Sequence, residues 1–228
     1  MQKHQNSLKE ATSHKETIER KKTMNSKEYF EKVADQWDKM RSSFFSEEVR
    51  EKAYKAADIK KGKQAADIGA GTGFVTEGLI REGLNVIAVD QSKTMIEELK
   101  KKFPDIDCRH GEAEDLPVAT ETMDYVFANM YLHHVERPAN AIKEMTRILG
   151  YGGQLIITDL DEHSFDFLKR EHHDRWMGFN REAISQWFKD AGLSDVKVEC
   201  VGQSCCADSC DGTNSAGVSI FVARGIKL

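Results

Sequence analysis

The stretch that most constrains the fold is DIGAGTGFVTEGL, residues 67–79, in which three glycines within five residues join two apolar segments. The run AADI, which ends at Ile68, has the length of a buried strand, and FVTEGLIREG has the length and pattern of a helix. Glycine allows a tight turn and removes the Cβ atoms that would keep a ligand away from the NH groups at the start of the helix. The stretch therefore predicts a strand, a ligand-binding turn and a helix.

Short apolar runs continue to alternate with helical segments to the end of the chain. Strands are expected at AADI, NVIAVD, IDCRHG, MDYVFAN, QLIITDL, VKVECV and VSIFVA. Helices are expected at residues 74–83, at 92–103, from Pro138 onward, and after Asn180, which is suited to cap the last one. Such an alternation predicts an α/β fold with a doubly wound, mostly parallel sheet. A chain of 228 residues is large enough for one such domain.

Two helices are expected before the first strand. In YFEKVADQWDKM, apolar side chains recur at i, i+3, i+4 and i+7, which predicts one helix with a single buried stripe. That stripe consists of Phe30, Val33, Ala34 and Trp37. The second helix is expected within residues 46–59.

Composition and charge narrow the classes of partner and location. The net charge of -5 provides no basic field for nucleic acid, so no nucleic-acid partner is expected. Residues 1–24 are polar and are expected to form an extension outside a folded domain at 25–228. No segment has the apolar length of a signal peptide core or membrane span, which predicts a cytoplasmic protein without a membrane partner. The five cysteines are expected as reduced thiols. The oligomeric state is not predicted.

The spacing of the glycines indicates which class of ligand the loop can bind. The dinucleotide fingerprint GxGxxG would need a last glycine where Phe74 or Thr76 stands, so an NAD-dependent oxidoreductase is disfavoured. Asp67, at the end of its strand, would repel a pyrophosphate and favours an uncharged or cationic group. Asp90 ends the next strand, where a carboxylate can accept hydrogen bonds from both ribose hydroxyls. Together these features predict an adenosine without phosphates, although Asp90 could instead be a turn or capping residue.

Four segments, DIGAGTG, VIAVD, GEAEDLP and MDYVFANMYLHHVERP, resemble in order and spacing the motifs of class I S-adenosylmethionine-dependent methyltransferases. The resemblance extends to the branch with ubiquinone/menaquinone-biosynthesis and arsenite methyltransferases. It implies a Rossmann-like, seven-stranded sheet whose last strand is antiparallel, with an N-terminal helical cap. It also implies S-adenosyl-L-methionine as cofactor and a small-molecule methyl acceptor.

The same resemblance assigns roles to the motif residues. Asp67 and the glycine loop would hold the methionine end of the cofactor, and Asp90 would hold the ribose. Gln91 and Met95 would flank the adenine, and Glu112 and Ala113 would recognise its edge. Asn129 and Trp37 would close the methionine end. The full expected set is Trp37, Asp67, Gly69, Ala70, Gly71, Gly73, Asp90, Gln91, Met95, Glu112, Ala113 and Asn129.

His133 is the preferred general base, because a hydroxyl or amine acceptor must lose a proton and histidine titrates near neutral pH. The alternative is that the LHH segment only shapes the pocket. Residues 161–179 follow the fifth strand, where the related enzymes carry substrate-binding elements. His172 and His173 would point about 100° apart on a helix, so they are not expected to share a metal, and no metal site is assigned.

Four cysteines follow in CVGQSCCADSC and are expected in and after a strand, in the loop between the last two strands: Cys200, Cys205, Cys206 and Cys210. Thiolates bind soft metals and metalloids, but this spacing is not a standard zinc signature. A thiophilic, arsenite-like acceptor is therefore one alternative to incidental thiols. Another is a non-catalytic sensor that binds the cofactor or a metal.

Overall fold

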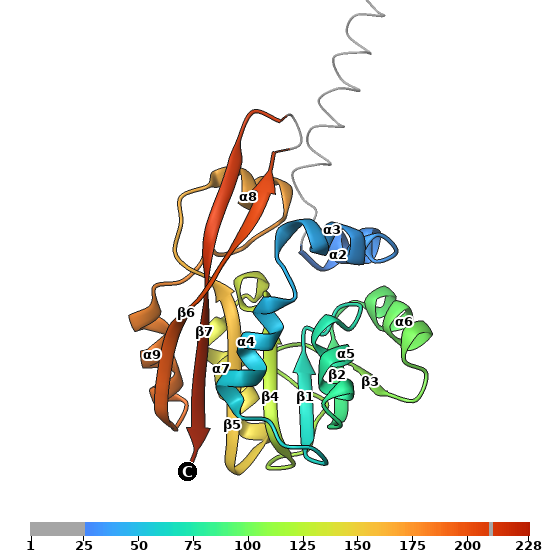
Figure 1. Cartoon of the computed structure of the whole chain (residues 1–228), viewed down its shortest axis with the longest axis vertical. Coiled ribbons are helices and arrows are strands. Elements are labelled where there is room, and N and C mark those ends of the chain that lie inside the picture. Colours follow the sequence, from blue (N-terminus) through green and yellow to red (C-terminus); the bar gives the residue numbers. More distant parts are fainter. Residues whose placement is uncertain (1–25, 210–211) are drawn as a thin grey trace, which may run out of the picture.

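The computed structural model describes residues 26–209 and 212–228, and its centre is a seven-stranded sheet with the order β3-β2-β1-β4-β5-β7-β6 (Figure 1). The strands are β1 Gln64–Ile68, β2 Asn85–Asp90, β3 Asp107–His110, β4 Met123–Asn129, β5 Leu149–Leu160, β6 Leu193–Asp208 and β7 Ser215–Lys227. β1 to β5 are parallel, whereas β7 runs antiparallel to both β5 and β6. The expected fold class is thus confirmed. The expected extension at 1–24 lies outside the described residues, and the boundary at 25 stays a prediction.

The central strands are apolar on both faces because helices cover both sides of the sheet. Successive residues of a strand point to opposite faces, and in β4 Tyr125 and Phe127 belong to one apolar cluster while Val126 and Ala128 belong to the other. The first cluster includes α4 (Glu48–Ala57) and α5 (Phe74–Arg81). The second includes α7 (Pro138–Ile148) and α9 (Arg181–Asp190). α6 (Lys93–Lys102) packs on β2.

Two helices begin at the residues that their sequence indicates. Ser92 accepts a hydrogen bond from the backbone NH of Met95, which caps α6. Asn180 accepts bonds from the NH groups of Glu182 and Ala183, so its predicted capping of α9 is confirmed. In α9 Ile184 and Phe188 are fully buried, but Trp187 is only half-buried.

The N-terminal segment differs from the expected single helix. It forms α2 (Ser26–Val33) and α3 (Trp37–Phe44), separated by a turn in which the NH of Gln36 bonds to the carbonyl of Val33. The bend turns the expected stripe into an edge-to-face contact between Phe30 and Trp37, whose ring centroids are 5.1 Å apart. Both rings are half-buried because they cover cavities at the carboxyl ends of the strands rather than a packed core. Figure 1 shows α2 and α3 above that edge of the sheet.

The last hairpin is much longer than the predicted strands, and it extends past the sheet to lie beside α8 (Asp166–Glu171) (Figure 1). Its outer part pairs Cys205 with Val218 and Ala207 with Ala216. Val218, Ala207 and Ala216 are buried in an apolar cluster that Cys205 also contacts, and this burial keeps the chain in strand conformation where a loop was expected. Among the described helices, none has the length and apolar character needed to cross a membrane.

Candidate active site

The glycine loop between β1 and α5 takes backbone conformations that other residues adopt at a cost. Gly69, Gly71 and Gly73 have φ angles of 70°, 54° and 96°. A Cβ on Gly69 would lie 2.3 Å from the ring of Tyr131, whereas a Cβ on Gly71 would lie 3.5 Å from Trp37 Nε1. Position 69 must therefore be glycine both because of the turn and because the Tyr131 ring lies against it. The sequence did not reveal the contact with Tyr131.

Asp90 connects the end of β2 to this loop. Its Oδ2 accepts a hydrogen bond of 2.8 Å from the NH of Gly71, and its Oδ1 accepts one of 2.8 Å from the NH of Ser92. Burial raises the pKa of Asp90, and these hydrogen bonds oppose the rise. The carboxylate thus acts as the turn residue that the sequence left as an alternative, and it also lines the cavity described next.

Asp67 lies at the end of β1 and is almost completely buried. Its Oδ2 accepts hydrogen bonds from both the NH and the hydroxyl of Thr76, at 2.9 and 2.6 Å. Burial raises the pKa of Asp67 to about 7 despite these bonds. A cation placed beside this carboxylate would favour its ionised form.

A cavity lies between the glycine loop and the N-terminal helices. Nine of the twelve expected cofactor residues line it: Trp37, Asp67, Gly69, Ala70, Gly71, Asp90, Gln91, Met95 and Asn129. Tyr131, Arg41 and His134 also line it and were not expected from the sequence. We call this space the loop cavity.

Three expected residues lie outside the lining of the loop cavity. Gly73 is the N-cap of α5 and lies on a different surface hollow. Glu112 and Ala113 line an adjoining cavity that shares Gln91 and Tyr131 with the first. The Glu112 side chain is 69% exposed and its carboxylate is 4.0 Å from Lys27 Nζ, so its predicted contact with an adenine edge remains a prediction.

A second cavity, of about 510 Å³, adjoins the loop cavity. The two share a wall made of Phe30, Trp37, Phe45, Met130 and His134. The rest of the second cavity comes from α2 and α3, from the ends of β4 and β5, from α8 and the segment after it, and from the hairpin: Tyr29, Phe44, His133, Leu160, Leu168, His172, Asp174, Cys205 and Ala207. Its lining is largely aromatic and aliphatic, with a polar corner at the end of β4 and β5. We call this space the aromatic cavity.

His133 occupies that polar corner and is buried. Its Nδ1 is 2.7 Å from Asp159 Oδ1, and its Nε2 is 3.8 Å from Asp174 Oδ1. Burial lowers the pKa of His133, but the two carboxylates outweigh it and raise the pKa to about 9. A histidine that already holds a proton at neutral pH is a poor base, so this pairing argues against the role that the sequence favoured for His133.

His134 was not singled out, yet it contributes to the wall between the two cavities. Burial lowers the pKa of its ring well below the usual value, and the neighbouring His133 lowers it further. Asp159 could have been predicted from the sequence, because it lies at the carboxyl end of its strand, as Asp67 and Asp90 do. Asp174 follows a helix end in an irregular segment, and only the tertiary structure brings it to the histidines.

Comparisons with known proteins agree with this arrangement. Residues 66–157 match the model of a methyltransferase domain family. The chain is 34% identical to 2-methyl-6-phytyl-1,4-hydroquinone methyltransferase 2 of Oryza sativa over 69% of its own length and 47% of the relative. It is 29% identical to demethylmenaquinone methyltransferase of Renibacterium salmoninarum over 59% of this chain and 68% of that one. A solved S-adenosylmethionine-dependent methyltransferase from Aquifex aeolicus shares the fold, with a TM-score of 0.60, 19% identity, and coverage of 86% of this chain and 98% of the other.

The chain belongs to the class I S-adenosylmethionine-dependent methyltransferases. It spans about half the length of the plant relatives that it matches. The motif set at residues 67–138, on which the resemblance was based, lies within the matched region.

The loop cavity of this methyltransferase fits the cofactor that its class uses. Asp90 keeps an acceptor lone pair on each oxygen for a ribose hydroxyl, because each oxygen receives one backbone hydrogen bond. Asp67 would offer a carboxylate to a cationic amino-acid end, and Trp37 would offer an aromatic ring to a sulfonium. An adenosyl sulfonium would therefore meet complementary groups at each end of the cavity.

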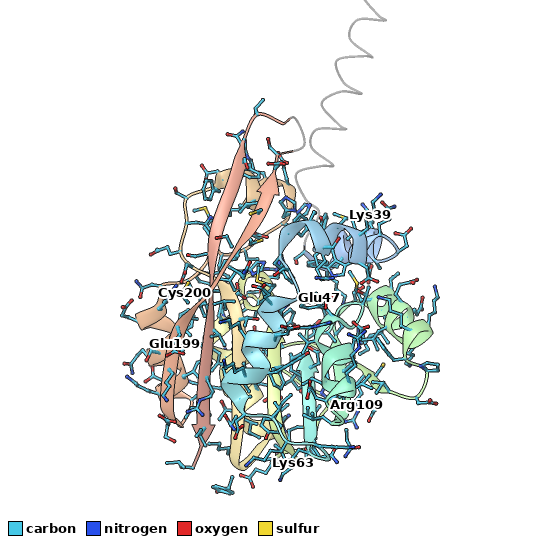
Figure 2. All side chains as sticks on the ribbon, viewed as in Figure 1. Lys39, Glu47, Lys63, Arg109, Glu199 and Cys200 are labelled. Carbon is cyan, nitrogen blue, oxygen red and sulfur yellow. The ribbon has the colours of Figure 1, made fainter. Side chains whose placement is uncertain are left out.

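The described cysteines do not form the soft-metal cluster that the sequence left open. Cys200, labelled in Figure 2, is exposed on β6, and Cys206 is also exposed. Cys205 faces the aromatic cavity, since adjacent strand residues point to opposite faces. Within residues 26–209 and 212–228, no cysteine belongs to a group of three convergent metal-ligand atoms. Cys210 lies outside the described residues.

Proposed function

We propose that this chain transfers the methyl group of S-adenosylmethionine to a hydroxylated aromatic small molecule of the hydroquinone type. The observation that carries the proposal is the shared wall between the loop cavity and the aromatic cavity. Cofactor and acceptor placed in adjoining cavities would face each other there. The relatives support the acceptor class, since their names specify a phytyl hydroquinone and a demethylmenaquinone.

The cofactor would supply an electrophilic methyl group, and the protein's part is to hold the two reactants in line and exclude water. Asp90 and the glycine loop would fix the nucleoside, while Asp67 and Asn129 would fix the amino-acid end. Aromatic rings of α2 and α3 would hold a planar acceptor and cover the reacting atoms. The buried polar corner would bind the ring hydroxyl. His133, the base predicted from the sequence, would contribute there as a hydrogen-bonding group.

A direct assay tests the proposal. The protein is incubated with methyl-labelled S-adenosylmethionine and with hydroquinones, catechols and amines, and S-adenosylhomocysteine is measured. We expect turnover with hydroquinones and none with aliphatic amines. If the cofactor binds but none of the hydroxylated rings is methylated, the proposal is wrong and a cofactor-binding sensor becomes the better interpretation.

Trp37 should matter to both substrates, because it lines both cavities. We expect Trp37→Ala to lower kcat/KM for cofactor and acceptor alike, by about 10-fold or more, through loss of an aromatic contact worth about 0.5–2 kcal/mol and of water exclusion. Trp37→Phe should retain most of the activity. Trp187→Ala is the matched control, because Trp187 packs on Phe179 at α9 and lines neither cavity. Steady-state kinetics of the three variants decide the question, and equal losses in Trp37→Ala and Trp187→Ala would contradict it.

Cofactor affinity should depend on pH through Asp67, whose pKa of about 7 is raised by burial. A bound cation lowers that pKa, so binding expels a proton below pH 7 and the Kd should fall as pH rises from 6 to 8, then level off. Asp90 and Tyr54 are the other titratable groups whose charges interact with Asp67, and burial raises the pKa of both above their usual values. Calorimetry at several pH values measures the effect.

Two controls isolate the carboxylate. Asp67→Asn should bind the cofactor more weakly but with a flat pH profile. Methylthioadenosine lacks the cationic amino-acid end and should bind the wild-type protein equally well across the range. A pH slope that survives in Asp67→Asn would assign the titration to another group.

A further inference from the structure

The polar corner of the aromatic cavity contains a second arrangement with chemical meaning. His133 and His134 from the short 3-10 helix Leu132–His134 meet Asp174 from the segment after α8, and one ligand atom of each lies within 4.8 Å of the other two. All three residues are buried. The adjacent histidines can converge because they lie on a tight turn, with ring centroids 4.0 Å apart, and not on an α-helix.

Each imidazole is fixed through the nitrogen that points away from the cluster. His133 Nδ1 is 2.7 Å from Asp159 Oδ1. The His134 ring is hydrogen-bonded to the backbone of His173 and its Nδ1 has no partner among the described residues, so the bond involves Nε2. Histidines that bind metals are held in this way, by a carboxylate or carbonyl behind the ring.

The nitrogens left over face the same oxygen. His133 Nε2 is 3.8 Å and His134 Nδ1 is 3.9 Å from Asp174 Oδ1. Both separations exceed a hydrogen bond. Ligand atoms around a tetrahedral metal with bonds of about 2.1 Å are about 3.4 Å apart, so each of these two separations would contract by roughly half an ångström. The two nitrogens lie within 4.8 Å of each other and would also have to approach. The buried Nδ1 of His134 is otherwise an unsatisfied acceptor, which costs free energy unless something binds it.

We propose that His133 Nε2, His134 Nδ1 and the Asp174 carboxylate bind one divalent transition metal ion of the Zn²⁺ type. Two imidazoles and one carboxylate form a donor set that suits zinc and its neighbours, whereas Mg²⁺ and Ca²⁺ prefer oxygen ligands alone. The ion would displace the proton of His133 to solvent, and the carboxylates of Asp159 and Asp174 with two neutral imidazoles would then balance the charge of the ion. The sequence assigned no metal site, because it indicated neither the tight turn nor the approach of Asp174.

The aromatic cavity lies on the open side of the three ligands, since all three residues also line it. A metal with a free coordination position there would take an oxygen atom of the acceptor and favour its ionised form. This second step rests on the proposed function, whereas metal binding itself does not. Cys205 is the described cysteine that lines the same cavity, outside the group of three convergent ligand atoms.

Metal binding is tested on untagged, full-length protein after chelation and removal of the chelator. Co²⁺ and Zn²⁺ are titrated in separate experiments, with elemental analysis for stoichiometry, visible absorption of Co²⁺ for geometry, and competition between the two ions for affinity. We expect one ion per chain and the intense visible bands of four- or five-coordinate Co²⁺. Weak bands of six-coordinate Co²⁺, or binding below one ion per chain, would overturn the proposal.

Substitutions of the proposed ligands test which residues bind the ion. Asp174→Asn and His133→Gln should each abolish stoichiometric binding, and Asp159→Asn should weaken it about 10- to 100-fold by releasing the His133 ring. Glu162→Gln is the control, an exposed acid between β5 and α8 that should bind as the wild type does. The absorption spectra of Co²⁺-loaded Cys205→Ser and Cys206→Ser are compared with that of the wild type. Loss of a sulfur-to-cobalt band in one variant shows which thiol binds the ion. Binding that is unchanged in both Asp174→Asn and His133→Gln would refute the site.

Two further readouts separate the possible failures. Thermal unfolding and S-adenosylmethionine binding by metal-free Asp174→Asn show whether the variant is folded, since Asp174 does not line the loop cavity. If chelated wild-type protein methylates hydroquinones as fast as protein with one metal ion, the acceptor step of this inference is wrong while the proposed function stands. If the ion binds as expected and no ring is methylated, the proposed function is wrong while the metal site stands.

Discussion

Replacing Asp90 with alanine should weaken S-adenosylmethionine binding by about 100-fold or more. The variant loses a carboxylate that accepts hydrogen bonds from the NH groups of Gly71 and Ser92 and that would accept ribose hydroxyls. Hydrogen bonds to a charged group are worth about 1.5–3 kcal/mol each, so the loss of two already corresponds to 100-fold. Calorimetry with the cofactor and with S-adenosylhomocysteine measures the change.

A deoxy analogue separates the ribose contact from the support of the loop. The wild type should bind adenosine more tightly than 2′,3′-dideoxyadenosine, and this preference should disappear in Asp90→Ala. Asp124→Asn is the matched control, since Asp124 also accepts a hydrogen bond from a neighbouring backbone NH, that of Gln64, and lies beside Lys63 at the opposite end of β1 (Figure 2). A hydroxyl preference that persists in Asp90→Ala would show that another residue holds the ribose.

Gly69→Ala should destabilise the protein strongly and impair cofactor binding. The new Cβ would lie 2.3 Å from the Tyr131 ring, and the residue would remain at a φ of 70°. A left-handed conformation costs about 1–2 kcal/mol for a residue with a Cβ, and overpacking adds about 1–3 kcal/mol. We expect a loss of about 2–5 kcal/mol in the free energy of unfolding, measured by urea denaturation.

Gly62→Ala provides the matched control. Gly62 has a φ of 84°, but a Cβ there would meet nothing within 4 Å, so only the conformational cost applies. The double variant Gly69→Ala/Tyr131→Ala should be less destabilised than the sum of the two single changes, because the clash is removed. Strict additivity, or equal losses at Gly62 and Gly69, would mean that Tyr131 does not restrict the loop.

The local sequence pattern was sufficient to predict the strands, the glycine turn and most residues of the loop cavity. The βαβ register brings the ends of β1, β2 and β4 to one edge, so residues at strand ends such as Asp67, Asp90 and Asn129 had to gather there. These residues owe their placement to contacts close in sequence or to neighbouring strands of a parallel sheet. Gly73, Glu112 and Ala113 are the exceptions, and nothing in the segment of Glu112 indicates that its side chain faces outward.

The aromatic cavity and its polar corner depend on contacts between distant segments. The bend between α2 and α3 turns Phe30 and Trp37 over the cavities, and the long hairpin brings Cys205 to the segment after α8. Asp174 meets His133 across 41 positions of the sequence in a region without regular secondary structure. The sequence by itself determined the sheet and the cofactor-type loop, because periodic burial and backbone restrictions are local. The tertiary structure alone decided the state of His133 and the acceptor side, because the charge and burial that act on a group come from whatever distant segments fold against it.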